Sequence, residues 1–178
     1  QGRGAAAHFK LASPRLIVMG TLGKAAGGAG AFVAGSENAV EWILQKARTY
    51  IFSTAEPALI AHALLTALDL IERGDDRRSN LAARIAQLRA SYAPKRWKLL
   101  PSQTAIQPLL IGGNAETMAV AVKLYERGLW VPGIRPPTVP AGTARLRITL
   151  SAAHSEAQLA QLVAALQQLE SDSMEETA

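Results

Sequence analysis

The residue with the clearest capacity for chemistry is Lys24, which lies in a glycine-rich segment directly after a short apolar run. Leu-Ile-Val-Met over residues 16–19 leads into Gly-Thr-Leu-Gly-Lys-Ala-Ala-Gly-Gly over residues 20–28. Glycines let a backbone approach a ligand closely, Thr21 supplies a hydroxyl, and the loop N–H groups suit a phosphate. A lysine here can hold a phosphate as a cation. It can also attack an aldehyde, if burial or neighbouring cations favour the neutral amine.

A nucleotide-binding P-loop is the first alternative for this segment, and the spacing excludes it. That motif needs a glycine, four further residues, and then Gly-Lys followed by Ser or Thr. Val18 occupies the position of the first glycine, and Ala25 occupies that of the hydroxyl residue. From the local pattern alone, the remaining alternative is a surface lysine in a flexible turn.

A second candidate site follows from Arg145 and Arg147 in the strictly alternating stretch 145–150. A strand there puts both guanidinium groups on the face opposite the intervening apolar residues. Two guanidinium groups about 7 Å apart can bind a carboxylate or a phosphate. The alternative is a solvated strand face. Arg135, fixed between an isoleucine and a proline, is a weaker candidate for the same role.

Composition narrows the class of protein. The chain has 178 residues, a net charge of +5 and no cysteine. The absence of cysteine excludes disulfides, thiolate metal sites and a cysteine nucleophile, and it fits a reducing, cytoplasmic compartment. The three histidines, His8, His62 and His154, are scattered, so we expect no metal site, and His154 before a helix is most simply structural.

The positive charge favours anions such as phosphates, carboxylates or coenzyme A, or else it is a solvated basic surface. Aromatic residues do not alternate with Lys and Arg, so we expect no nucleic-acid partner. No apolar run approaches the roughly 20 residues needed to span a bilayer, and the first residues do not form a signal peptide. Because the sequence lacks an initiator Met, we expect a processed or cut chain.

The first part of the chain contains apolar elements that cannot cover one another. The expected elements are strands over 16–19 and 31–35, a helix over 38–46, an extended segment over 50–54 and an apolar helix over 57–73. A helix that is apolar on most sides belongs inside a larger body. We therefore expect a missing partner body, in the same protein or in a neighbouring chain.

The second part reads as a compact α+β unit, and the stretch 74–76 is the best boundary, giving domains 1–75 and 76–178. The expected elements are a helix with one face through residues 81, 85, 88 and 92, a strand over 106–111, a helix through 118–125, an irregular proline-rich loop over 132–142, a strand over 145–150, and a helix after a Ser155–Gln158 capping box. The polar stretch 171–178 is expected to fray.

Several of these segments resemble the α-oxoamine synthases, a family of fold-type-I pyridoxal-phosphate enzymes. The first is Thr-Leu-Gly-Lys-Ala-x-Gly from Thr21, followed by Gly-Ala-Phe-Val over 30–33. The resemblance spans nearly the whole chain in order, through residues 48–55, 106–109, 128–131, 134–140, 142–148 and 150–154. It implies an α/β fold made of the end of the large cofactor-binding domain, 1–75, and the small C-terminal α+β domain, 76–178.

The resemblance also implies roles for single residues. Lys24 would form the Schiff base with pyridoxal 5′-phosphate and move protons at the substrate α-carbon, and Thr21 would bind the cofactor phosphate. Ser53 and Thr54 would approach the phosphate in the neighbouring subunit of a homodimer with shared sites. Arg147 would hold the amino-acid carboxylate. Thr138 would contact substrate, with Arg135 as a further candidate.

The loop 134–140, Ile-Arg-Pro-Pro-Thr-Val-Pro, points to the branch of the family that condenses L-alanine with a pimeloyl thioester of coenzyme A or of a carrier protein, a step of biotin biosynthesis. The family's N-terminal half is absent, so we expect this chain alone to be an inactive fragment. The alternatives are another α-oxoamine synthase, such as 5-aminolevulinate synthase or 2-amino-3-ketobutyrate coenzyme A ligase, and a non-catalytic domain that dimerises or binds a partner.

Overall fold

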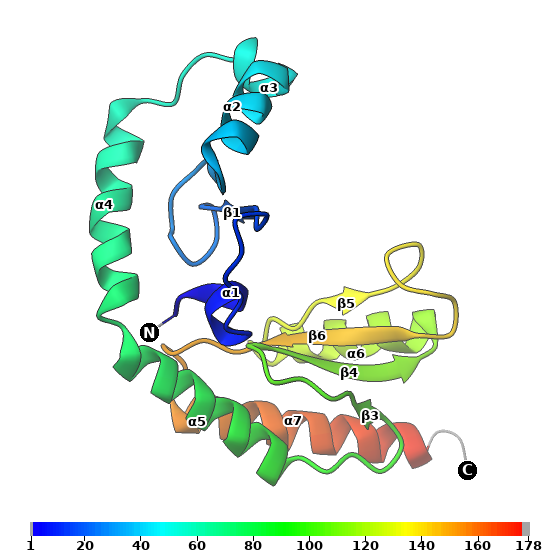
Figure 1. Cartoon of the computed structure of the whole chain (residues 1–178). Helices are drawn as coiled ribbons and strands as arrows, with labels where there is room; N and C mark the ends of the chain where they lie inside the picture. Colours follow the sequence, from blue (N-terminus) through cyan, green and yellow to red (C-terminus); the bar gives the residue numbers. More distant parts are fainter. Residues whose placement is uncertain (1, 176–178) are drawn as a thin grey trace. The chain divides into compact units, whose positions relative to one another are not determined.

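The computed structural model describes residues 2–175, and the chain divides into two compact units (Figure 1). The first unit ends at Asp75 and the second begins at Asp76. The first unit opens with the short helix α1 (Gly4–His8) and continues into an antiparallel hairpin of β1 (Val18–Thr21) and β2 (Ala31–Ala34). Within residues 2–175, no helix is long and apolar enough to cross a membrane.

The strand expected at 16–19 is present but begins later, because pairing with β2 sets its ends. Val18 pairs with Ala34, and Thr21 pairs with Ala31. Gly20 continues the strand where the sequence suggested a stop. A Cβ atom at Gly20 would lie 2.5 Å from Cε1 of Phe32, so the phenylalanine ring occupies the space that a side chain would need.

Three helices follow the hairpin: α2 (Glu37–Lys46), α3 (Arg48–Ile51) and α4 (Ala58–Glu72). The expected helices over 38–46 and 57–73 are confirmed, but the extended segment expected over 50–54 is wrong. The backbone N–H groups of Ile51 and Phe52 donate to the carbonyls of Ala47 and Arg48, which closes helical turns. A β-rich composition needs a strand to pair with, and none of the described residues supplies one there.

The first unit exposes its apolar side chains, as the sequence predicts for a part that cannot cover itself. None of its described hydrophobic residues is buried. On α4, the exposed fractions are 75% for Leu59, 63% for Leu65 and 54% for Leu68. The described residues of the unit therefore do not bury these leucines of α4.

The second unit is an antiparallel sheet with three helices. The sheet order is β3–β4–β6–β5, made of β3 (Lys98–Leu99), β4 (Ile106–Gly112), β6 (Ala144–Thr149) and β5 (Gly133–Ile134). The helices are α5 (Asp75–Ser91), α6 (Asn114–Glu126) and α7 (Glu156–Glu175). The three helices and two main strands match the expected ones. The short strands β3 and β5 were missed, and β5 lies inside the stretch expected to be an irregular loop.

The capping box at the start of α7 is confirmed. The backbone N–H of Ser155 donates to the Gln158 side chain at 2.9 Å, and the Gln158 N–H donates to Ser155 Oγ at 3.2 Å. The fraying expected over 171–178 is wrong for residues 171–175, which continue the helix. Ser171 Oγ donates to the carbonyl of Gln167 there. Residues 176–178 lie outside the described part of the chain.

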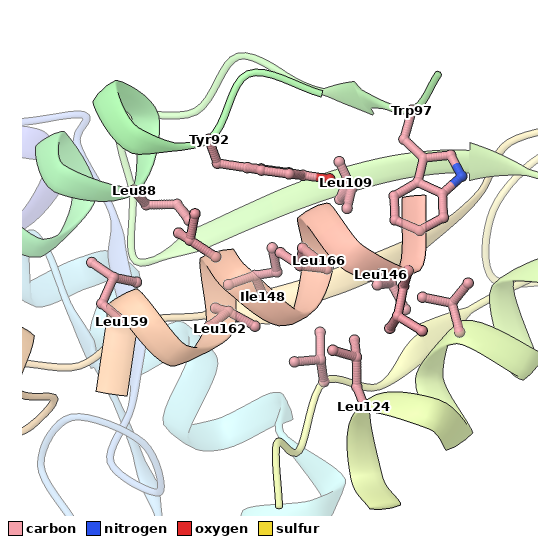
Figure 2. Packing of buried hydrophobic residues seen from close by; sticks show 14 of the residues in the cluster. Leu88, Tyr92, Trp97, Leu109, Leu124, Leu146, Ile148, Leu159, Leu162 and Leu166 are labelled. Atoms are coloured by element: carbon pink, nitrogen blue, oxygen red, sulfur yellow. The ribbon is translucent and has the colours of Figure 1, made fainter. Parts of the chain in front are cut away.

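One face of the sheet packs against the helices to form the core (Figure 2). Leu109 on β4 pairs with Leu146 on β6, and both are fully buried, as are Leu88 of α5 and Leu166 of α7. Arg145 is half-buried and Arg147 is exposed, alternating with Leu146 and Ile148. Both arginines therefore belong to the face opposite the helices, as expected.

Candidate active site

The loop that carries Lys24 is held closed by backbone hydrogen bonds. The Leu22 N–H donates to the Gly30 carbonyl, and the Gly28 N–H donates back to the Leu22 carbonyl, both at 2.9 Å. The Gly27 N–H donates to the carbonyl of Lys24 itself at 2.9 Å. Gly27 and Gly30 have φ angles of 64° and 88°, which side chains other than hydrogen rarely permit. The glycines thus give the lysine a defined loop rather than a flexible turn.

Helix α4 approaches the same loop closely at Gly28. A Cβ atom at Gly28 would lie 2.7 Å from Cδ2 and 3.3 Å from Cγ of Leu64. A side chain at this position would require the Leu64 side chain to move. From the sequence, the loop glycines are interpreted as allowing close approach of a ligand, and no local signal indicates that Leu64, more than thirty residues away, lies against Gly28.

The Lys24 amine is exposed, and so is Thr21 at the end of β1. The described residues therefore leave the amine within reach of a ligand. An amine, a hydroxyl and a glycine-rich backbone fit a cofactor that carries an aldehyde and a phosphate. In its donor chemistry, the loop thus fits pyridoxal phosphate.

Ser53 and Thr54 follow α3 and are exposed. The Ser53 N–H donates to the carbonyl of Tyr50 at 3.5 Å, which places this residue at the end of a helical turn. No described contact joins either residue to the Lys24 loop. Their predicted role concerns the cofactor of a second subunit, and it stays a prediction.

The second unit carries the other predicted residues on and beside β6. Arg147 is exposed on the sheet face opposite the helices, and its cross-strand partner is Pro108. Arg135 and Thr138 are exposed in the loop 135–143, which joins β5 to β6. Arg145 differs, because its Nε donates to the carbonyl of Thr143 at 2.9 Å and its side chain is half-buried.

Lys24 belongs to the first unit and Arg147 to the second. The positions of the two units relative to one another are not determined (Figure 1). Arg135, Thr138 and Arg147 lie in the β5–β6 hairpin and its loop in the second unit, whereas Thr21 and Lys24 lie in the β1–β2 hairpin of the first.

Glu170 is a buried charged group that the sequence analysis missed. It is 5% exposed, and its Oε1 accepts hydrogen bonds from the backbone N–H groups of Arg96 at 2.7 Å and Trp97 at 2.9 Å. Burial, and then the Glu170 carboxylate, raise the pKa of the Tyr92 phenol above its usual value. These groups lie within the core, so their role is to hold the chain between α5 and β3.

A cavity of about 250 Å³ opens at the start of α7, on the helix side of β6. Leu129, Trp130, His154 and Leu162 are among its lining residues, which include no predicted site residue. His154 Nδ1 accepts a hydrogen bond from the Ser151 N–H at 3.2 Å, consistent with the structural role expected for it. No group of three or more His, Cys, Asp or Glu side chains among residues 2–175 could hold a metal ion.

Comparison with known protein families identifies the family to which this chain belongs. The family described as aminotransferase class I and II matches residues 3–166. The chain belongs to this family. The match covers both the Lys24 hairpin and the Arg147 strand, and it confirms the resemblance and the α/β fold class drawn from the sequence motifs.

Curated members of the family include close relatives of this chain. The 8-amino-7-oxononanoate synthase of Dechloromonas aromatica is 62% identical over 169 residues, covering 94% of this chain and 44% of the relative. The synthase of the same name from Janthinobacterium sp. (strain Marseille) is 58% identical over 171 residues, covering 95% of this chain and 43% of the relative. The chain thus spans less than half the length of these relatives.

Solved structures of the family show the same fold. The 8-amino-7-oxononanoate synthase of Francisella tularensis matches with a TM-score of 0.76 and 28% identity, over 92% of this chain and 47% of that one. The serine palmitoyltransferase of Sphingomonas wittichii matches with a TM-score of 0.75 and 28% identity, over 86% of this chain and 39% of that one. The TM-scores of these two enzymes are nearly equal, and both are 28% identical to this chain. The higher identity, 62% and 58%, is to the two synthases named above.

Proposed function

We propose that this chain is the carboxyl-terminal part of a pyridoxal-phosphate-dependent enzyme that condenses L-alanine with a pimeloyl thioester to give 8-amino-7-oxononanoate, with release of carbon dioxide and of the free thiol of coenzyme A or the carrier protein. The observation that carries the proposal is the 62% identity to a synthase of that name, over a segment that includes Lys24 and Arg147. Pyridoxal phosphate is the cofactor that membership of the family supports.

The Lys24 amine would bind the cofactor aldehyde, and the Thr21 hydroxyl would donate a hydrogen bond to the cofactor phosphate. When bound, pyridoxal phosphate supplies an electron sink for negative charge at the amino-acid α-carbon. The freed Lys24 amine would then take a proton from that carbon. The ordered hairpin loop supports this role, because backbone hydrogen bonds from Leu22 and Gly28 fix the segment on which the lysine sits.

Arg147 would bind the carboxylate of L-alanine through its exposed guanidinium group. Arg135 and Thr138, in the loop beside β6, would face the thioester, whose carrier is coenzyme A or a carrier protein. Ser53 and Thr54 would approach the cofactor phosphate of a second subunit. A homodimer with shared sites would cover part of the apolar surface on α4. We place the enzyme in the cytoplasm.

A chimera tests this function. Its matched segment comes from this chain, and its remainder comes from the Dechloromonas aromatica relative. We expect it to form 8-amino-7-oxononanoate from L-alanine and pimeloyl-coenzyme A. Lys24→Ala should lower kcat by roughly 10²–10⁴-fold, the usual range for losing a positioned proton-transfer group. Lys46→Ala, which removes an exposed lysine from α2 of the same unit, should leave kcat unchanged.

The outcomes separate the alternatives. A folded chimera that condenses L-serine with palmitoyl-coenzyme A, but not L-alanine with pimeloyl-coenzyme A, would show that the chain belongs to another branch of the family. A folded chimera with no condensing activity toward either pair would favour a non-catalytic domain. Equal activity of the Lys24→Ala and Lys46→Ala variants would remove Lys24 from the chemistry.

A further inference from the structure

The loop 135–143 has few hydrogen bonds of its own. Three of its residues, Pro136, Pro137 and Pro140, lack a backbone N–H. Its base is set by strand pairing, since Ile134 on β5 pairs with Arg145 on β6. Inside the loop, the Thr138 N–H donates to the Arg135 carbonyl at 3.1 Å. The conformation of the exposed tip thus depends on how firmly its two ends are held.

The end of the loop nearest β6 is held by a short chain of contacts. The N–H and Oγ1 of Thr143 both donate to the carbonyl of Pro140, at 3.1 Å and 2.7 Å. The carbonyl of Thr143 in turn accepts a hydrogen bond from Arg145 Nε at 2.9 Å. A hydrogen bond from a charged donor is stronger than a neutral one. Arg145 therefore holds Thr143, and Thr143 in turn holds this end of the loop through Pro140.

Arg147 shares the strand and the sheet face but not this environment. It is exposed where Arg145 is half-buried. Its backbone N–H donates to the carbonyl of Pro132 at 2.9 Å, and within residues 2–175 no hydrogen bond is described for its side chain. The spacing in the sequence suggested a pair of equivalent guanidinium groups. In the structure, one serves the loop and the other faces outward.

We propose that Arg145 is a positioning residue that fixes the loop 135–143, and with it Thr138, against the acyl chain of the thioester, and is not a second ligand for the amino-acid carboxylate. This rests on the proposed function. The loop between Arg135 and Arg145 carries prolines, Val139 and Ala141 and no charged side chain. An apolar tip of this kind suits an acyl chain, whereas a carboxylate suits Arg147.

The anchoring is tested in the 178-residue chain itself by amide hydrogen exchange. Arg145→Met keeps the apolar stem and removes the donor to Thr143. It should speed exchange at Thr138, Gly142 and Thr143 by about tenfold, because loss of one charge-assisted hydrogen bond changes a local opening equilibrium by about that factor. The matched control is Lys98→Met, which removes a cation from the same sheet face, since Lys98 pairs with Leu110 and Leu110 with Arg145. Unchanged exchange in Arg145→Met, or equal acceleration in both variants, overturns the anchoring.

The link to the thioester is tested in the active chimera by separating the two KM values. Arg145→Met should raise the KM for pimeloyl-coenzyme A by about tenfold and leave the KM for L-alanine within about twofold. Arg147→Met should do the reverse. Arg145→Lys, which can still reach the Thr143 carbonyl, should recover part of the loss. A rise in the L-alanine KM in Arg145→Met would show that Arg145 binds the carboxylate. A chimera without activity would refute the proposed function, while the exchange experiment would still decide the anchoring.

Discussion

Both units of this chain contain many apolar residues, but only the second unit buries them in a core. In the second unit, Leu88, Leu109, Leu146 and Leu166 are fully buried in one core. In the first unit, none of the described hydrophobic residues is buried, and α4 exposes most of its leucines. The second unit thus has a core of its own, whereas the first unit leaves its apolar side chains exposed.

The two parts of the candidate site, the Arg147 strand and the Lys24 loop, are therefore held in place by different interactions. The Arg147 strand is held by a complete sheet and three helices, so its geometry follows from residues within the unit. The Lys24 loop is held by backbone hydrogen bonds and by the contact of Gly28 with Leu64, without a buried core beneath it.

The largest expected effect on stability comes from removing a buried side chain from the core of the second unit. Leu166→Ala removes a fully buried side chain and should lower the free energy of unfolding by about 2–5 kcal/mol. Leu68→Ala on α4, where the side chain is 54% exposed, should change it by less than about 0.5 kcal/mol. Urea unfolding followed by far-ultraviolet circular dichroism, to which the helices of both units contribute, measures both. Equal losses would contradict the contrast between the units.

The next effect concerns the carboxylate inside the core. Glu170→Ala leaves the N–H groups of Arg96 and Trp97 without their acceptor, which should cost about 1–3 kcal/mol. Glu170→Gln keeps an acceptor oxygen and should lose clearly less, as measured by the same urea unfolding. If the two variants were equally destabilised, the charge of Glu170 rather than its hydrogen bonds would hold the segment.

A pH-dependent effect follows from Tyr92, whose pKa is raised above the ordinary value of 10.0 by burial and by Glu170. Below that value the phenol is protonated in both folded and unfolded chains. As the pH rises above it, only the unfolded chain ionises, so the free energy of unfolding should fall by up to about 1.4 kcal/mol per pH unit. Tyr92→Phe should lose this alkaline slope. Urea midpoints at about pH 9 and pH 11 compare the two proteins. An identical slope in both would show that Tyr92 ionises normally in the folded state.

The smallest expected effect compares two helix caps, one from each unit. Ser155 completes a reciprocal capping box at the start of α7, so Ser155→Ala should cost about 1 kcal/mol. Ser36 precedes α2 without a side-chain capping bond, so Ser36→Ala should cost much less. Thermal unfolding by circular dichroism gives both shifts. A larger shift for Ser36→Ala would contradict the assigned caps.

The parts of the fold that the sequence predicted are those set by local rules. The alternation around Arg147, the capping box at Ser155 and the apolar helix ending before Gly74 each depend on residues within a few positions, and each is confirmed. The predictions that failed depend on distant partners. Strand β5 exists because β6 pairs with it, and the segment after Arg48 is helical because no described strand pairs with it.

The candidate site divides along the same line. Lys24 and Arg147 stand out through residue type, spacing and motif, which are local. The separate environments of Arg145 and Arg147 were not predicted, because the strand spacing treats both side chains alike and does not show that Arg145 Nε binds the Thr143 carbonyl two residues away. The need for glycine at position 28 likewise comes from Leu64 on α4.

The central claim is that Lys24 holds pyridoxal phosphate, and borohydride reduction of the chimera with the cofactor tests it most directly. Reduction fixes the cofactor to the lysine that binds it, and peptide mapping identifies that residue. The account predicts one adduct, on Lys24, that is absent from the Lys24→Ala chimera and retained when Lys46 is replaced by alanine. A folded chimera that forms no adduct, or forms it on another lysine, would contradict the account.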